Sequence, residues 1–234
     1  MQHEVDEKKQ DEATIFKVPV GSISSNIAAI KLNEEGEEDP STTSASSDYT
    51  ESTEAKKSVS EILSSDAADE SLRKYKESLL GSAVTGDLGD PNDPRRVIVT
   101  EFRIIFEPSE GQADVVFNLD TPIGLEHLKK GLTIKEGAKY KFKLSFKVQH
   151  DIVSGIKFVN KIKKVMFSDT DELVIGSYPP SSTPHIFEFP RFNYIEAPSG
   201  MMYRGTYTVK NKFISSDKVT HLEYSYELRV SKTW

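Results

Sequence analysis

The 234-residue sequence predicts an all-β protein: an immunoglobulin-like antiparallel β-sandwich, preceded by a disordered acidic N-terminal arm with a short helix pair. Three observations support this prediction. Apolar and polar residues alternate with a period of two from about residue 95 onward. Only 3 of the 22 aromatic residues precede Pro94. The part up to Pro94 holds 9 Lys+Arg against 21 Asp+Glu, a net charge of −12, whereas the remainder holds 21 against 16, a net charge of +5.

The first 94 residues are predicted to form two segments. Residues 1–54 are rich in acids, serine and threonine and poor in core-forming side chains, which predicts a disordered acidic extension. In residues 55–94, Ser58 and Glu61 match a capping box at the start of a first short helix. Asp66 is expected to cap a second helix that ends at Gly81, with a turn-rich linker behind it. Helices shorter than about 12 to 15 residues are marginal in water, so this pair is expected to need a partner for stability.

The third segment, residues 95–234, is predicted to be the sandwich. Strict alternation marks three half-buried strands, from Ile98 to Phe106, from Tyr140 to Val148 and from Leu222 to Val230. A single helical turn is expected near Gly124 to Leu128. Weaker patterns predict five further strands, at Asp114 to Leu119, Ile156 to Lys163, Glu172 to Ser177, His185 to Phe189 and Tyr203 to Phe213.

Several classes of chemistry are excluded or disfavoured. The chain has no cysteine, which excludes disulfides, thiol catalysis and cysteine-ligated metal sites. It has no phosphate-binding loop, dinucleotide fingerprint, zinc-protease motif or acyl-hydrolase nucleophile motif. The five scattered histidines are interpreted as structural, and Asp169, Asp171 and Glu172 lack the glycine and spacing of an EF-hand loop. We therefore predict a protein that is not an enzyme and that has no cofactor and no metal site.

Charge and hydropathy also restrict the location and the partners. The N-terminal residues are charged, and no window approaches the roughly 18 apolar residues of a membrane span. The net charge of −7 disfavours nonspecific binding to nucleic acid. The sequence thus predicts a cytoplasmic protein without a transmembrane segment and without a nucleic-acid partner.

The predicted sandwich is rich in aromatic residues at inward positions. Such residues ordinarily fill a core, but they can also line a cavity between the two sheets. The sequence leaves both alternatives open. The aromatic residues concerned are Phe102, Phe106, Phe117, Tyr140, Phe142, Phe146, Phe158, Tyr207, Tyr224 and Tyr226.

Several strings, in order along the chain, resemble the Rho GDP-dissociation inhibitors. They are DESLRKYKESLLG (Asp69 to Gly81), IVSGIKFV (Ile152 to Val159), GSYPP, EAPSGMMYRGTY (Glu196 to Tyr207) and DKVTHL. The resemblance covers about Tyr49 to Trp234. It implies a protein that binds prenylated Rho-family GTPases, preferably with GDP bound, as a monomer in a 1:1 heterodimer. Such a protein blocks GDP release, hinders GTP hydrolysis and the access of activating proteins and exchange factors, and extracts the GTPase from membranes.

The resemblance also implies a site for the geranylgeranyl group inside the sandwich. At about 0.8 kcal/mol per buried CH₂, taking a 20-carbon chain out of a bilayer requires an apolar slot to receive it. Where the family carries tryptophans, this chain has Tyr224 and Tyr226, which give a similar wall with less area and added hydroxyls. By position, the prenyl-pocket residues are Phe102, Ile104, Leu132, Tyr140, Ile152 and Tyr226.

Two further surfaces follow from the resemblance. The helix pair is expected to act as a regulatory arm on the GTPase switch regions, through Asp69, Ser71, Leu72 and Tyr75. Acidic residues are expected to bind the polybasic tail that precedes the prenyl group, in competition with anionic lipids. The candidates are the acids between positions 34 and 54 together with Asp169, Asp171, Glu172, Glu196 and Asp217.

Two other functions remain as alternatives to this interpretation. A general prenyl-lipid carrier would share the sandwich but lack the clamp on the GTPase, and the helical DESLRKYKESLLG segment disfavours it. An adhesion or scaffold domain would have a filled core and bind no isolated prenylated peptide. The absence of both a signal peptide pattern and cysteine disfavours that class.

Overall fold

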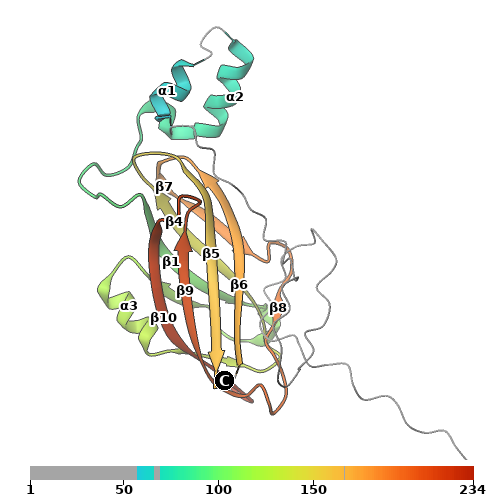
Figure 1. Cartoon of the computed structure of the whole chain (residues 1–234). Helices are drawn as coiled ribbons and strands as arrows, with labels where there is room; N and C mark the ends of the chain where they lie inside the picture. Colours follow the sequence, from blue (N-terminus) through green and yellow to red (C-terminus); the bar gives the residue numbers. More distant parts are fainter. Residues whose placement is uncertain (1–56, 66–68, 166) are drawn as a thin grey trace, which may run out of the picture.

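A computed structural model describes residues 57–65, 69–165 and 167–234, and it contains two five-stranded β-sheets packed face to face (Figure 1). The predicted acidic extension, residues 1–54, lies outside the described residues. The first sheet has the order β2 (Val115–Asn118), β1 (Val97–Phe106), β4 (Lys139–Val148) and β7 (Ser181–Phe189), and β8 (Ile195–Glu196) also pairs with β4. The second sheet has the order β3 (Leu132–Lys135), β10 (Thr220–Ser231), β9 (Gly205–Ile214), β5 (Val153–Lys164) and β6 (Phe167–Tyr178).

The predicted fold class is confirmed. All eight predicted strands are present, and paired strands run antiparallel except for β3, which lies parallel to β10. Where a single helical turn was predicted, the structure has a longer helix, α3 (Pro122–Lys129). The Thr121 hydroxyl caps its first turn by accepting a hydrogen bond from Gly124 N at 3.1 Å. Strands β3 and β8 were not predicted, because β8 has only two residues, too few for alternation to be recognised, and β3 is a short strand whose pairing partner is the distant β10.

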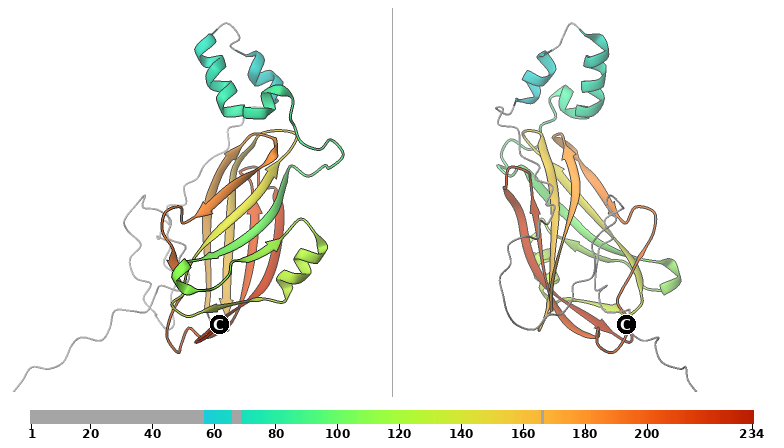
Figure 2. Two further views of the ribbon diagram at one scale, coloured as in Figure 1. Left: turned by 180° about the vertical axis from the view of Figure 1, so that it is seen from behind. Right: turned by 45° about the vertical axis from the view of Figure 1, so that its right-hand side comes forward.

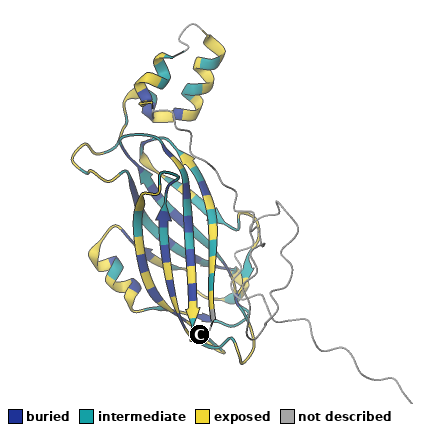
Figure 3. Cartoon of the chain, in the orientation of Figure 1, coloured by how far each residue is buried: buried dark blue, intermediate teal, exposed yellow. Residues whose placement is uncertain are grey.

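One hydrophobic core fills the space between the sheets. Buried and exposed residues alternate along the strands, as the bands of colour on β9 and β10 show (Figure 3). The side chains of Phe102, Ile104, Tyr140, Phe146 and Phe213 are almost completely buried there. The alternation read from the sequence therefore corresponds to the inward and outward faces of the two sheets.

The two predicted helices are present at one end of the sandwich, opposite the C-terminus (Figures 1 and 2). Helix α1 (Val59–Ser64) begins with the predicted capping box of Ser58 and Glu61. Helix α2 (Glu70–Leu80) ends at Gly81, as predicted, but its N-cap is Asp69 and not Asp66, which lies outside the described residues. The Asp69 carboxylate accepts hydrogen bonds from the backbone N–H groups of Ser71 and Leu72 at 2.9 and 3.0 Å, and these satisfy two free donors of the first turn.

The helix pair has a small apolar cluster of its own. A 3₁₀ helix, η1 (Gly81–Thr85), follows α2, and the buried side chains of Val59, Leu80 and Ala83 pack together. The Lys76 ammonium donates hydrogen bonds to the carbonyls of Ile62 and Ser65 at 2.7 Å each, which ties α2 to the C-terminal end of α1. Packing within the chain thus supplies some of the stability that was expected from a partner.

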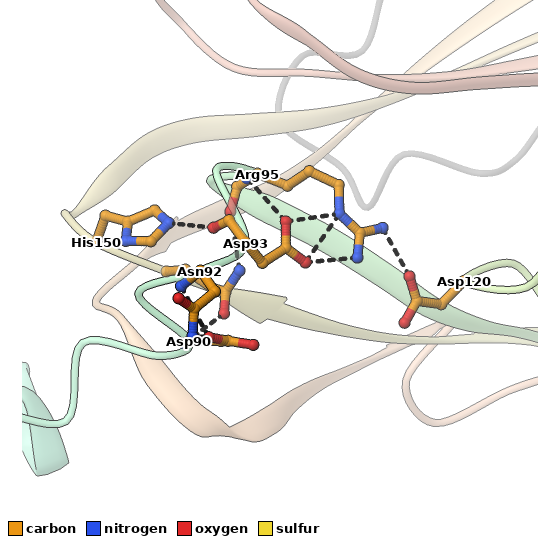
Figure 4. Close-up of polar contacts among 7 residues, drawn as sticks. Asp90, Asn92, Asp93, Arg95, Asp120 and His150 are labelled. Atoms are coloured by element: carbon orange, nitrogen blue, oxygen red, sulfur yellow. Dashed lines mark hydrogen bonds and ion pairs between the residues drawn. The ribbon is translucent and has the colours of Figure 1, made fainter.

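The linker between η1 and β1 is hydrogen-bonded to the sandwich. Asp87 accepts hydrogen bonds from the backbone and the hydroxyl of Ser182 at 3.0 and 2.8 Å. Farther along, the His150 ring lies 2.6 Å from the Asp93 carbonyl, and Arg95 forms ion pairs with Asp93 and Asp120 at 2.6 and 2.7 Å (Figure 4). Hydrogen bonds from Arg95 lower the pKa of Asp93 to about 2. The helix pair is therefore connected to the sandwich by a fixed segment.

Candidate functional site

A narrow hollow lies between the two sheets. The first sheet contributes aromatic and aliphatic side chains from β1 and β4, and the second sheet contributes side chains from β3, β5, β9 and β10. The lining residues are Phe102, Ile104, Leu132, Ile134, Tyr140, Phe142, Phe158, Asn160, Ile162, Val209, Asn211, Tyr226 and Leu228. Apart from the two asparagines and the tyrosine hydroxyls, the wall is apolar.

The structure brings five of the six predicted prenyl-pocket residues together around this hollow. They come from four strands in both sheets and are Phe102, Ile104, Leu132, Tyr140 and Tyr226. The sixth, Ile152, is not among the lining residues. It lies just before β5 and packs against the apolar cluster of the helix pair.

The hollow is almost closed. The centre of a water-sized sphere can occupy only about 20 Å³ of it, and roughly 10 to 15 Å³ measured in this way is needed to hold one water molecule. A 20-carbon lipid therefore enters only if side chains or strands move apart.

Ring contacts make up much of the wall. The Phe102 ring lies 5.5 Å from that of Phe142, 6.3 Å from Tyr224 and 6.4 Å from Tyr226, measured between centroids. Burial raises the pKa values of Tyr140, Tyr224 and Tyr226 well above the ordinary tyrosine value. Their hydroxyls are therefore neutral at physiological pH, and the wall carries no charge.

Helix α2 presents an apolar face to solvent. Tyr75 is 60% exposed and Leu79 is 57% exposed, and both follow the exposed Ser71 at intervals of four residues. Residues at this spacing lie on one side of a helix. The predicted residues Ser71 and Tyr75 thus lie on the same exposed side of α2, and Asp69 caps this helix. Leu72 is half-buried and lies on the side of α2 that also carries the buried Leu80. The site prediction omitted Leu79, although its helical spacing from Tyr75 was a usable signal.

The predicted tail-binding acids are not gathered into one cluster. Asp171 pairs across the strands with Asn160, which lines the hollow, so Asp171 and its alternate neighbour Asp169 are on the inner side of the edge strand β6. Glu172 is on the outer side, 3.5 Å from the Lys157 ammonium. Of these three acids, Asp169 and Asp171 are therefore the two that face inward, each opposite a β5 residue that lines the hollow.

Two further acids occupy other places. Glu196 is exposed on β8, which pairs with the first residues of β4. Asp217 forms an ion pair with Arg96 at 2.7 Å, near the end of the sandwich that carries the helices. The acids between positions 34 and 54 lie outside the described residues.

The described part of the chain shows neither a metal-binding cluster nor a membrane-spanning helix. No group of three or more histidine, aspartate or glutamate side chains in residues 57–65, 69–165 and 167–234 is arranged to hold a metal ion. Within the same residues, no helix has the length and apolar composition that crossing a bilayer requires. The hollow and the exposed face of α2 are thus the features that a functional account must explain.

Comparison with known proteins agrees with these features. Residues 30–233 match the family model described as RHO protein GDP dissociation inhibitor. The chain is 39% identical over 182 residues to Rho GDP-dissociation inhibitor 1 of Rattus norvegicus, covering 77% of this chain and 84% of that protein. It is 38% identical to Rho GDP-dissociation inhibitor 1 of Homo sapiens and to the Rho GDP-dissociation inhibitor of Schizosaccharomyces pombe, each over 182 residues and 84% of that protein, with 77% and 76% of this chain covered.

Proposed function

The chain belongs to the Rho GDP-dissociation inhibitor family of non-enzymatic regulators, and we propose that it inhibits by holding a prenylated Rho-family GTPase at two places. The hollow between the sheets shelters the geranylgeranyl group, and the exposed face of α2 binds the switch regions of the GDP-bound protein. Lipid shelter allows the GTPase to leave the membrane, and the clamp on the switch regions slows GDP release.

The observation that carries this proposal is the hollow itself. An isoprenoid has no hydrogen-bonding groups along its chain, and it leaves a bilayer only for a site that is as apolar. The side chains of Phe102, Ile104, Leu132, Tyr140 and Tyr226 converge from both sheets on one interior space. A lipid that separated the sheets would meet these side chains on two sides.

The helix pair supports the second part of the proposal. Two adjacent large apolar side chains, Tyr75 and Leu79, are exposed on a helix that the rest of the chain holds in place. Exposed aromatic and aliphatic residues of this kind are typical anchors of a protein interface. They favour a protein partner at this end of the molecule over a carrier that binds only lipid.

The acids on β6 fit the same complex. In a prenylated Rho GTPase the basic tail directly precedes the lipid, so acids that bind it should lie close to the lipid site. Asp169 and Asp171 are on the inner side of the edge strand β6, opposite Ile162 and Asn160 of β5, which line the hollow. We infer that these two acids contribute more to tail binding than Asp217, because they lie beside strand β5 of the hollow whereas Asp217 lies next to Arg96 near the helix pair.

The proposed function is tested by titrating the full chain with a GDP-loaded Rho GTPase in its geranylgeranylated and unprenylated forms. We expect the prenylated form to bind at least tenfold more tightly, and GDP release to slow for both forms at saturation. Equal affinities would refute the lipid site. Binding of a free geranylgeranylated peptide as tight as that of the whole GTPase, with unaltered GDP release, would instead support a general prenyl carrier.

Ile152→Ser should separate the two halves of the proposed mechanism. Because Ile152 packs on the cluster of Val59, Leu80 and Ala83, its loss removes on the order of 1 kcal/mol of apolar packing from the helix pair. We expect faster hydrogen exchange in α1 and α2 and weaker slowing of GDP release, with unchanged binding of a free geranylgeranylated peptide.

The control for this variant is Ile123→Ser, which removes an apolar side chain that is exposed on α3. It should alter neither hydrogen exchange in the helix pair nor GDP release. If Ile152→Ser, confirmed as folded, fails to bind the peptide, then Ile152 belongs to the lipid site, as the family resemblance implied.

A further inference from the structure

A row of polar side chains crosses the inner face of the second sheet, inside the hollow. Asn160 on β5 pairs with Asn211 on β9, which pairs in turn with Tyr224 on β10. Cross-strand partners point to the same side of a sheet, and both asparagines line the hollow. The two neighbouring rows of inward-facing side chains are hydrophobic. Phe158 and Phe213 form the row on the side of the helix pair, and Ile162, Val209 and Tyr226 form the row on the other side.

At its other end the row reaches the edge of the sandwich. Asn160 pairs with Asp171 on the edge strand β6, and Asp171 is half-buried. Burial increases inward along the row, with Asn160 8% exposed and Asn211 1% exposed. The row therefore extends polar character from the edge of the sheet to the wall of an otherwise apolar space.

Asn211 has one polar atom without a partner. Its amide nitrogen donates a hydrogen bond to the Tyr224 hydroxyl at 3.2 Å, but no group in the described part of the chain donates to its buried Oδ1. A buried amide with an unmet hydrogen bond is unfavourable, so this atom is suited to a ligand that completes the bond.

We propose that Asn211 is a polar subsite within the lipid hollow, which binds a hydrogen-bond donor, either water or the hydroxyl of a lipid, and lowers the affinity for an all-carbon isoprenoid. This inference depends on the proposed role of the hollow as the prenyl site. The hollow that Asn211 lines has room for one water molecule. An isoprenoid that displaces this donor offers nothing in exchange, so Oδ1 is left unpaired in the complex.

Such a subsite suits a protein that must also release its cargo. A wholly apolar pocket would hold an isoprenoid more tightly than one with an amide in its wall. The polar row thus sets an upper limit on lipid affinity without changing the clamp on the GTPase. It follows that affinity for the lipid should rise when the amide is replaced by an apolar group of the same shape.

Asn211→Leu tests this directly, because leucine has nearly the same shape but no polar atoms. It is made together with Tyr224→Phe, so that the hydroxyl that Asn211 bonds is not left buried without a partner. With the full chain and a geranylgeranylated peptide, we expect binding about tenfold tighter than for Tyr224→Phe alone. The control is Thr208→Leu, which adds a leucine on the exposed outer face of the same strand and should leave the affinity unchanged. A thermal unfolding curve establishes that all of these variants fold.

Equal or weaker peptide binding by the folded double variant, compared with Tyr224→Phe alone, would overturn the inference. Binding of geranylgeraniol distinguishes the two sources of the donor. If a lipid hydroxyl is the donor, geranylgeraniol should bind more tightly to the unaltered protein than to Asn211→Leu. If water supplies it, a crystal structure of the lipid-free full chain should contain a water bonded to Asn211 Oδ1.

Failure of the proposed function gives a different result. If neither the unaltered chain nor any variant binds the prenylated peptide, the lipid site is refuted. In that case the crystal structure and the geranylgeraniol titration still decide the subsite. Finding neither water nor the alcohol at Asn211 overturns the subsite independently.

Discussion

Val209→Phe is expected to weaken binding of a geranylgeranylated Rho GTPase by several hundredfold. Val209 is almost completely buried in the middle of β9 and lines the hollow. A phenyl ring there occupies space that one five-carbon isoprene unit would need, and at about 0.8 kcal/mol per carbon this loss amounts to about 4 kcal/mol. Because each 1.4 kcal/mol or so is a factor of ten in affinity, a loss of this size is readily measured by titration.

The matched control is Thr208→Phe, which places the same ring one residue away on the exposed outer face of β9. It should leave the affinity for the prenylated GTPase unchanged. Val209→Phe should in turn leave the affinity for the unprenylated GTPase unchanged, because the clamp on the switch regions is far from the substitution. If folded Val209→Phe still extracts prenylated GTPase from liposomes as the unaltered protein does, the lipid site is elsewhere.

The double substitution Tyr75→Ala, Leu79→Ala is expected to abolish the slowing of GDP release at concentrations where the unaltered chain is effective. Both side chains are exposed on α2, so their removal should leave the fold intact. Two anchors at a protein interface, at about 1.5 kcal/mol each, correspond to a loss of affinity on the order of a hundredfold. Nucleotide release from the unprenylated GTPase measures this effect without any contribution from the lipid.

Arg73→Ala is the control for the double substitution. Arg73 lies on another side of α2, where it is paired with Glu77 at 3.9 Å, and an exposed pair of this kind contributes little to stability. Release of GDP should remain slow with this variant. If the Tyr75→Ala, Leu79→Ala variant slows GDP release as much as the unaltered chain does, the exposed face of α2 does not bind the GTPase.

Much of the sandwich could be predicted because period-two alternation depends only on nearby residues. The long strand β10 alternates from Leu222 to Val230, so its inward face was evident from the sequence. Strand β3 could not be predicted because its pairing depends on β10, almost 100 residues later in the chain. The three-segment division of the chain stays a prediction.

The lining of the hollow was predictable where inward alternation and family resemblance pointed to the same residue, as for Phe102 and Tyr226. Ile152 differs because it packs against the apolar cluster of the helix pair, and no local pattern reveals packing between segments so distant in sequence. Asn211 left a usable signal that was not recognised. It interrupts the inward apolar series of β9, and a polar residue at such a position indicates either an internal partner or a bound ligand.

The near absence of space between the sheets has a consequence for the free protein. A permanently open apolar channel would make the free protein prone to self-association. Closure covers this apolar lining. In the complex that we propose, the free energy of parting the sheets is subtracted from the free energy gained by contact with the lipid, and the measured affinity for an isoprenoid is the difference between the two.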